Sequence, residues 1–476
     1  MAEDLKKETI KGVVWSAVEL LSTKGIIFVA NILLARLLTP EDFGLIAILT
    51  IFIEVAQTFI DSGFSNALIQ KKDRSQLDYS TVYFFNLGIA VVLYCICFFC
   101  APLIAEFFKN QELVGLTRVV CLNFLIGALI SVHRTRLSVE LMFKQQSLVT
   151  LVSTVVAAGV SLYCAYTGWG VWALVLLSLV NVSMQTLMYY IFMHWHPSLE
   201  FSITAFRRLF SYSSKLLGAS LIHILYRQIY PVVIGKRFSP EELGYYNRAD
   251  QFAMYPSNIV SMVVSRVAFP IFSRIQDDNK RLRSAYRKYI TFTAYIVFPL
   301  YAYLIFMAKP LTEELLTSKW LPMVPLFMIL ALDWMPDFMN LINLNVLFVK
   351  GRSDLAFKIE VIKKTLAVII LFISLYWGIL GVCLGRLVYG VIAIGFNSFY
   401  TNRLIGLSVA QQLKCLILPG LYSFLIIGFL LLLKTFLLSN LTLLSIGLGG
   451  TLLIYVVLLA LTPSSPLKEI KQIMTR

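Results

Sequence analysis

The sequence predicts an all-α integral membrane protein that crosses a bilayer many times, most simply fourteen. Three observations predict it: the composition, the long apolar runs, and the placement of positive charge. Hydrophobic residues make up 58% of the 476 residues and charged residues 14%, whereas a soluble chain carries about 25% charged residues. A soluble fold has too little polar surface to hide such a surplus of apolar side chains, so lipid is the expected solvent.

Fourteen stretches are long enough to cross a bilayer core, which takes about 20 helical residues. Long continuous apolar runs favour helices over alternating strands, and a helix satisfies its backbone groups within one segment. The stretches lie near residues 13–36, 43–63, 80–104, 113–132, 147–166, 170–193, 211–235, 243–270, 289–308, 322–348, 358–377, 379–401, 415–437 and 441–462. No connection between them is long enough to form a soluble domain.

Positive charge predicts the orientation. With the N-terminus placed in the cytoplasm, 27 of the 41 lysines and arginines fall on the cytoplasmic side, 8 on the other side, and 6 within spans. This bias predicts that both termini are cytoplasmic. The first apolar stretch carries Glu19 and Lys24 and has no small-residue cleavage site, so it is predicted to be a retained span. The net charge of +15 does not indicate nucleic acid, because no basic run lies on a soluble domain.

Cofactor and metal motifs are not predicted. The Cys97-x-x-Cys100 pair lies in an apolar run with no second pair to complete a zinc site. The four histidines lack zinc spacing, and no Walker loop is present. We therefore expect no catalytic residue, no metal and no cofactor, with H⁺ or Na⁺ as the candidate coupling ions.

A repeated box predicts the internal organisation. Residues 39–44 read Thr-Pro-Glu-Asp-Phe-Gly, and two hundred residues later residues 239–244 read Ser-Pro-Glu-Glu-Leu-Gly. A hydroxyl cap, a proline and first-turn acids start a helix. The spacing predicts two parallel six-span repeats with a cavity between them. The predicted lobes are residues 1–200 and 201–405, followed by a two-helix appendix over residues 406–476.

The run Leu33-Leu34-Ala35-Arg36-Leu37-Leu38-Thr39-Pro40-Glu41-Asp42-Phe43-Gly44-Leu45 resembles the Wzx-type exporters of bacterial polysaccharide synthesis. The resemblance extends to the branch with colanic-acid and teichuronic-acid exporters. These belong to the multidrug/oligosaccharidyl-lipid/polysaccharide (MOP) superfamily, with the lipid II flippases and MATE drug antiporters. The duplicated lobes and trailing helices agree with the resemblance over essentially the whole chain.

The resemblance implies a flippase of the bacterial inner membrane. Its cargo would be an undecaprenyl-pyrophosphate-linked oligosaccharide, moved by alternating access while the lipid tail stays in the bilayer. Other polysaccharide-assembly proteins are candidate partners, and no nucleic acid is expected.

Cations inside the spans are candidate cargo-binding groups, because a pyrophosphate in a low-dielectric site needs fixed positive charge. Lys24 lies about 16 Å from either end of the first span, too deep for its stem to reach water, and Asn31 shares its face. Arg227 and Arg386 lie at intermediate depth. For three shallower cations, snorkelling to the interface is the first explanation and a cavity role the alternative: Arg118, Lys215 and Arg266.

Two sets of acids form the second group of candidates. Glu54 and Asp61, with Gln57 between them, share one face of the second span. Asp333 and Asp337 do the same in the tenth span, beside a proline at 336 that is predicted to break the helix. These acids either neutralise the cations or bind the coupling H⁺ or Na⁺.

Three rival functions stay open at this point. A MATE-like cation antiporter shares the fold, but it favours an acidic lumen, whereas basic residues are at least as numerous within these spans. A glycan polymerase or ligase is disfavoured because no large outer loop is present. A scaffold without transport would not require Lys24 and Glu54 at mid-membrane depth.

Overall fold

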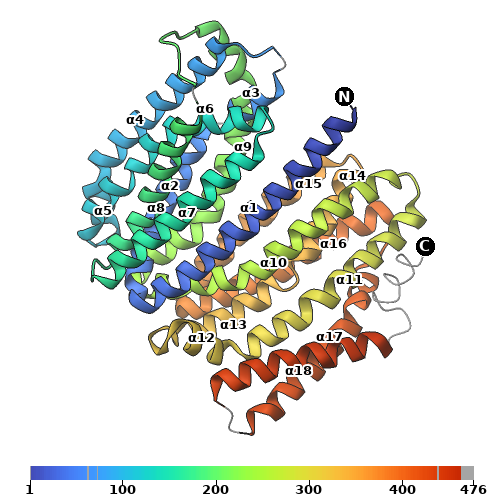
Figure 1. Cartoon of the computed structure of the whole chain (residues 1–476). Helices are drawn as coiled ribbons and strands as arrows, with labels where there is room; N and C mark the ends of the chain where they lie inside the picture. The colour runs from blue at the N-terminus through green and yellow to red at the C-terminus, as the bar shows by residue number, and fades with distance from the viewer. Residues whose placement is uncertain (1, 62–63, 72, 194, 437–438, 462–476) are drawn as a thin grey trace. The chain divides into compact units, whose positions relative to one another are not determined.

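The structure is a computed structural model that describes residues 2–61, 64–71, 73–193, 195–436 and 439–461 (Figure 1). Within these ranges every regular element is a helix and no strand is present. The predicted all-α class is confirmed. The predicted C-terminal tail lies outside the described residues.

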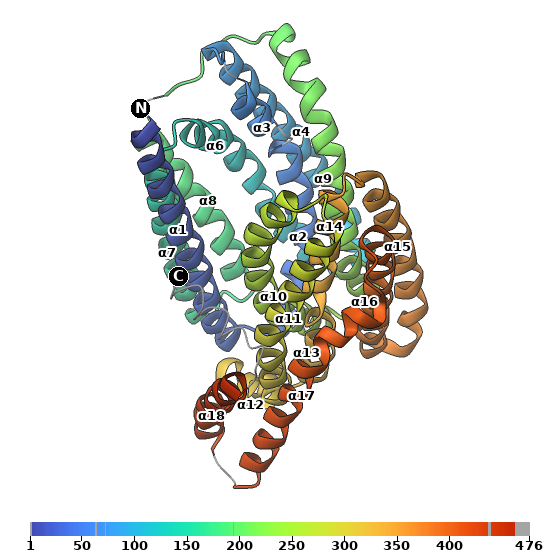
Figure 2. The same cartoon turned by 90° about the vertical axis from the view of Figure 1, so that its right-hand side faces the viewer.

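The chain forms two compact units, residues 1–244 and 245–476. The first unit contains nine helices that lie wholly within its described residues. They are α1 (Ala2–Leu37), α2 (Pro40–Asp61), α3 (Phe64–Gln70), α4 (Gln76–Phe108), α5 (Glu112–Val120), α6 (Leu122–Val139), α7 (Phe143–Tyr166), α8 (Trp172–Phe192) and α9 (Ile203–Arg237). Within this unit α1 lies along α7, and α7 lies along α8 (Figures 1 and 2).

The second unit begins within the first turns of α10 and holds the remaining helices. They are α10 (Pro240–Arg274), α11 (Asn279–Phe306), α12 (Ala308–Leu316), η1 (Ser318–Trp320), α13 (Met323–Trp334), α14 (Asp337–Val349), α15 (Ser353–Ser374), η2 (Leu375–Trp377), α16 (Gly378–Ile405), α17 (Val409–Lys434) and α18 (Asn440–Leu461). The helix break predicted at Pro336 is confirmed, because α13 ends at Trp334 and α14 begins at Asp337.

Ten helical stretches among the described residues are long and apolar enough to cross a membrane, which establishes an integral membrane protein. Three predicted spans, 13–36, 211–235 and 243–270, fall on the long helices α1, α9 and α10, which are not among the ten. One stretch, Ser353–Ile405, covers two predicted spans, separated by η2. The number fourteen therefore stays a prediction.

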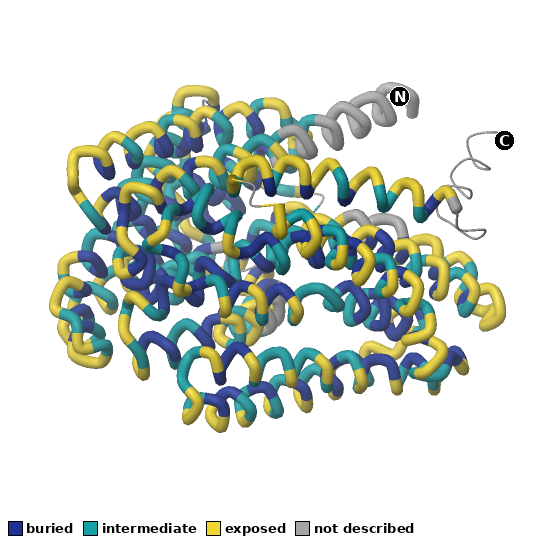
Figure 3. Tube along the Cα trace, turned by 90° about the horizontal axis from the view of Figure 1, so that it is seen from below, coloured by how far each residue is buried: buried dark blue, intermediate teal, exposed yellow. Residues whose placement is uncertain are grey.

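The outer faces of the helices are apolar, as lipid requires. Buried and exposed residues alternate along individual helices (Figure 3). On α17 the exposed positions are occupied by large apolar side chains, including Leu421, Phe424 and Leu425. In water such a face would be costly at about 25 cal/mol per Å², whereas in lipid it is solvated.

Both repeated boxes start helices as predicted. Thr39 Oγ1 accepts a hydrogen bond from the Asp42 backbone N–H at 3.3 Å, and the Asp42 carboxylate accepts one from the Thr39 N–H at 2.8 Å. Ser239 and Glu242 form the same reciprocal pair, both bonds at 3.1 Å. The first helical residues are Pro40 and Pro240. The local part of the repeat is confirmed.

The two boxes also contact each other through their glycines. A Cβ atom added at Gly44 would lie 1.7 Å from the carbonyl oxygen of Pro240, and one added at Gly244 would lie 1.9 Å from that of Pro40. Each box thus places a glycine against the backbone of the other, with the same residues in exchanged roles. Only a residue without a side chain permits this approach, as in small-residue helix contacts of membrane proteins.

Helix α9 packs within the first unit, against α2, α3 and α4. The segment before it is fastened to the start of α4: the Ser198 N–H donates to Ser80 Oγ at 2.9 Å, and the Ser202 N–H donates to Thr81 Oγ1 at 3.1 Å. The compact units divide after residue 244, whereas the sequence repeat divides near residue 200, and α9 accounts for the difference. The lobes defined by the repeat stay a prediction.

Within the second unit, polar contacts attach the two trailing helices to α11. Tyr286 of α11 donates to Asn343 Oδ1 at 2.7 Å and lies 2.8 Å from Gln412 Oε1 of α17. Tyr303 donates to the Leu444 carbonyl of α18 at 2.9 Å. Because buried polar groups are costly unless paired, these bonds fix α17 and α18 against α11.

Substitution of either crossing glycine should destabilise the protein. Gly44→Ala and Gly244→Ala each place a methyl group on a backbone oxygen, and such overpacking costs about 3 kcal/mol. We expect a lower midpoint of thermal unfolding in detergent and less protein in the membrane. Gly88→Ala and Gly159→Ala are the controls, because a Cβ there meets nothing within 4 Å. Equal midpoints for all four variants would show that the crossing contributes no stability.

Candidate functional site

An ion pair joins α2 to α9 within the first unit. Arg227 of α9 donates from a terminal guanidinium nitrogen to Glu54 Oε1, and the neighbouring Gln228 donates from Nε2 to Glu54 Oε2. Both carboxylate oxygens are therefore held by α9. The side chain of Arg227 is 55% exposed and that of Glu54 is 26% exposed, whereas Gln228 is 6% exposed. The predicted cation and the predicted acid thus form one site.

The other predicted residues of the first unit are spread over separate helices. Lys24 is exposed on α1, and Asn31 is half-buried on the same helix. Arg118 of α5 lies over the ring of Phe98, with 4.4 Å from Cζ to the ring centroid. These three residues lie on α1 and α5, whereas the Glu54–Arg227 pair lies on α2 and α9. The side chains of Asp61, Lys215 and Arg266 lie outside the described set.

Arg386 of α16 is the centre of a network in the second unit. Its Nε lies 2.9 Å from Asp333 Oδ2, and its Nη1 lies 2.8 Å from Asp250 Oδ1 and 3.0 Å from the Tyr246 hydroxyl. Trp334 donates from Nε1 to Asp250 at 2.7 Å, and its ring lies 5.1 Å from the guanidinium carbon. The side chain of Arg386 is only 14% exposed. A single guanidinium thus partly neutralises two carboxylates.

A second acid continues this polar region. Asp337 accepts a hydrogen bond from Asn340 at 3.3 Å, and Asn397 of α16 donates to Asn340 Oδ1 at 2.8 Å. Gly390 provides space for the network, because a Cβ there would lie 2.4 Å from Asp333 Oδ1. The break after Trp334 thus places Asp333 and Asp337 on either side of an interrupted helix. Both predicted acids border one polar cluster.

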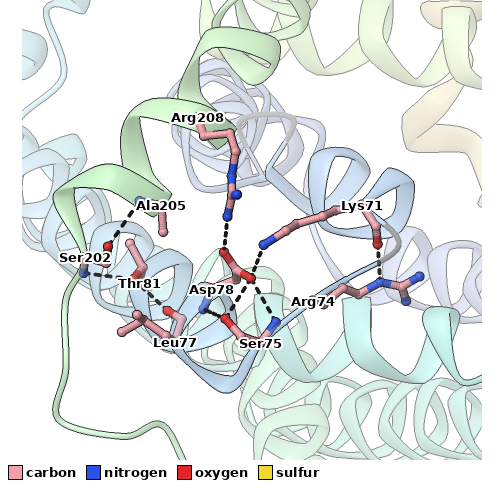
Figure 4. A network of polar contacts seen from close by, with 9 residues as sticks. All are labelled: Lys71, Arg74, Ser75, Leu77, Asp78, Thr81, Ser202, Ala205 and Arg208. Atoms are coloured by element: carbon pink, nitrogen blue, oxygen red, sulfur yellow. Dashed lines mark hydrogen bonds and ion pairs between the residues drawn. The ribbon is translucent and has the colours of Figure 1, made fainter.

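A third charged cluster lies where α4 begins (Figure 4). The Asp78 carboxylate, 1% exposed, accepts from Lys71 Nζ and from Arg208 at 3.1 Å. It also accepts from the Ser75 N–H at 2.8 Å, which closes a capping box. Arg208 belongs to α9, so this cluster fixes the start of α9 to the start of α4. It is a structural anchor outside the candidate site.

Several members of these clusters were not predicted from the sequence. Asp250 lies inside a predicted span, so the rule that selected Lys24 would also have selected it. Tyr246 precedes it by one helical turn. Gln228 and Trp334 have no comparable sequence signal, because an uncharged residue beside a charged one is common. Among the described residues, no group of three or more His, Cys, Asp or Glu is placed to hold a metal ion.

Removal of Arg386 should destabilise the second unit strongly. Arg386→Ala leaves Asp250 and Asp333 without their cation, and breaking a buried pair costs about 3–5 kcal/mol. Arg386→Met combined with Asp333→Asn should recover part of that loss, because Asp250 keeps the Trp334 donor. The measurement is the thermal unfolding midpoint in detergent. Arg352→Ala, which breaks an exposed pair with Asp354, is the control and should leave the midpoint unchanged. A double variant no more stable than the single one would contradict the pairing.

Comparison with known proteins gives concordant results. The model of the family described as polysaccharide biosynthesis protein matches residues 33–325, more than half of the chain. The teichuronic acid biosynthesis protein TuaB of Bacillus subtilis is 28% identical over 74% of this chain and 74% of its own length. The lipopolysaccharide biosynthesis protein WzxC of Escherichia coli is 27% identical over 87% of this chain and 85% of its own length.

Solved structures share the fold. The lipid II flippase MurJ in an inward closed conformation superposes with a TM-score of 0.74 and 17% identity, over 94% of this chain and 98% of that one. An inward-facing MATE multidrug transporter of the MOP superfamily gives 0.62 and 13% identity, over 83% of this chain and 98% of that one. The chain therefore belongs to the polysaccharide biosynthesis protein family.

Proposed function

We propose that this protein is a flippase that moves an undecaprenyl-pyrophosphate-linked oligosaccharide across the bacterial inner membrane by alternating access. The observation that carries the proposal is the family match, because it covers more than half of the chain. The fold shared with MurJ supports it, since that protein is a lipid II flippase. We assign no catalytic residue.

The charges at membrane depth support a pyrophosphate cargo. A pyrophosphate leaving water loses hydration, and fixed cations offset that cost. Arg227 and Lys24 both carry exposed side chains on helices of the first unit. Arg386 is enclosed by carboxylates, so its direct contribution to cargo binding is smaller. We propose Arg227 and Lys24 as the principal cargo contacts, with Asn31, Arg118, Lys215 and Arg266 as further lining residues.

The acids are proposed to couple transport to an ion gradient. Asp250, Asp333 and Arg386 together carry one net negative charge when ionised, and Asp337 adds a second. An excess carboxylate at this depth is stabilised by a proton or a sodium ion. We further propose that both termini are cytoplasmic and that other polysaccharide-assembly proteins supply the cargo or receive it.

Sidedness of the cargo tests the proposed function. Everted and right-side-out vesicles are prepared from cells with and without the chain, and lipid-linked oligosaccharide is modified by a membrane-impermeant sugar reagent. Without the chain, the oligosaccharide should accumulate facing the cytoplasm, and restoring the chain should move it outward. Unchanged sidedness together with reduced efflux of cationic drugs would instead indicate the antiporter that this fold also supports.

Lys24 is predicted to be needed for this transport. Lys24→Ala should abolish outward movement of the oligosaccharide with normal protein levels, because a mid-membrane cation is lost, whereas Lys24→Arg should retain part of it. Lys309→Ala is the matched control, since Lys309 is an exposed lysine predicted to lie outside the membrane. The vesicle assay measures all three variants. Normal transport by Lys24→Ala would remove Lys24 from the site.

A further inference from the structure

The two partners of the α2–α9 ion pair are unequally exposed. The Arg227 side chain is 55% exposed and that of Glu54 is 26% exposed. Arg227 lies ten residues before the end of α9 at Arg237, or about 15 Å along the helix axis. The guanidinium is therefore deep along the helix and still accessible. An accessible cation at such depth is suited to an anionic ligand.

The guanidinium keeps donors that Glu54 does not use. A guanidinium carries five N–H groups, and Glu54 Oε1 accepts from one of its terminal nitrogens. Among the described residues, no second carboxylate lies within ion-pair distance of Arg227. Arg386 differs, because Asp250, Asp333 and Tyr246 all contact it. Within the described part of the chain, Glu54 is thus the carboxylate partner of Arg227, and it uses only some of the guanidinium N–H groups.

Glu54 keeps a partner if Arg227 leaves it. Its second oxygen accepts a hydrogen bond from Nε2 of Gln228, which is itself 6% exposed. Gln228 therefore holds the carboxylate in place while the adjacent guanidinium is free to turn. An exchange of partners at Arg227 then requires no separation of α2 from α9.

We propose that Glu54 is an internal competitor for Arg227. The pyrophosphate of the cargo displaces the Glu54 carboxylate from the guanidinium when it arrives, and the carboxylate displaces the pyrophosphate when the cargo leaves. Gln228 is the positioning residue that retains Glu54 during the exchange. This inference rests on the proposed function, since it takes the cargo to carry a pyrophosphate.

This competition balances tight binding of the cargo against its release. An unpaired guanidinium in a low-dielectric site binds a phosphate anion strongly. A transport site must bind well enough to load and weakly enough to release. A tethered carboxylate lowers the affinity and takes over the guanidinium on release, so Arg227 is not left as an isolated charge.

Binding of inorganic pyrophosphate to the purified full chain tests the exchange. Isothermal titration compares the wild type with Glu54→Gln and Arg227→Gln. Glu54→Gln should bind about five-fold more tightly, since removing the competitor frees one partly exposed ion pair of about 1 kcal/mol. Arg227→Gln should lose that binding. Glu140→Gln is the matched control, because Glu140 pairs with Arg136 at 2.7 Å with similar exposure, 39% and 33%, and it should bind like the wild type.

Glu54→Gln that binds no more tightly than the wild type would overturn the inference. If that variant does not accumulate, Glu54→Asp replaces it, and its shorter side chain should give an intermediate gain in affinity. The cargo is tested separately by the vesicle assay. Tighter binding by Glu54→Gln with chain-independent sidedness keeps the exchange and rejects the cargo. Unchanged pyrophosphate binding by Glu54→Gln, together with sidedness that depends on the chain, keeps the cargo and rejects the exchange.

Discussion

Charges within a membrane must be compensated, and the polar part of this structure depends on that constraint. An isolated ion at depth is costly, so a buried cation is stable only beside a carboxylate or in contact with water. Arg227 meets the requirement through Glu54, whose second carboxylate oxygen accepts a hydrogen bond from Gln228. Arg386 meets it through Asp250 and Asp333. In each case the ion pair joins two helices. It thereby fixes how each helix is turned about its own axis, which apolar packing alone would define less sharply.

The two pairs differ in their exposure and in the number of partners of the arginine. Arg386 is 14% exposed and has several partners, so its network stabilises the second unit around the break before Asp337. The Arg227 side chain is 55% exposed, and Glu54 accepts from only one of its terminal nitrogens. A ligand can reach the second kind of cation without dismantling a core. The lipid II flippase and the MATE transporter share this fold, so the fold alone does not determine what is transported.

Local features could be predicted from the sequence, and pairings could not. Hydropathy predicted the helices because lipid imposes length and apolarity on each segment. The box at Pro40 and Pro240 predicted two helix starts because capping is local. That Gly44 and Gly244 meet depends on tertiary packing, which the repeat does not encode by itself. For the same reason Glu54 and Arg227 were predicted separately, as an acid and a cation, and their contact emerged only in the fold.

The proposed function requires that this chain itself moves a lipid-linked pyrophosphate glycan between leaflets. The most direct measurement reconstitutes the purified chain in liposomes that carry undecaprenyl-pyrophosphate oligosaccharide in the inner leaflet. A membrane-impermeant glycosidase added outside then reports arrival of the glycan. If the claim holds, cleavage exceeds that in protein-free liposomes and depends on the amount of chain, under an imposed proton or sodium gradient where coupling requires one. A folded, correctly inserted chain that leaves the inner-leaflet glycan protected under every gradient would contradict it.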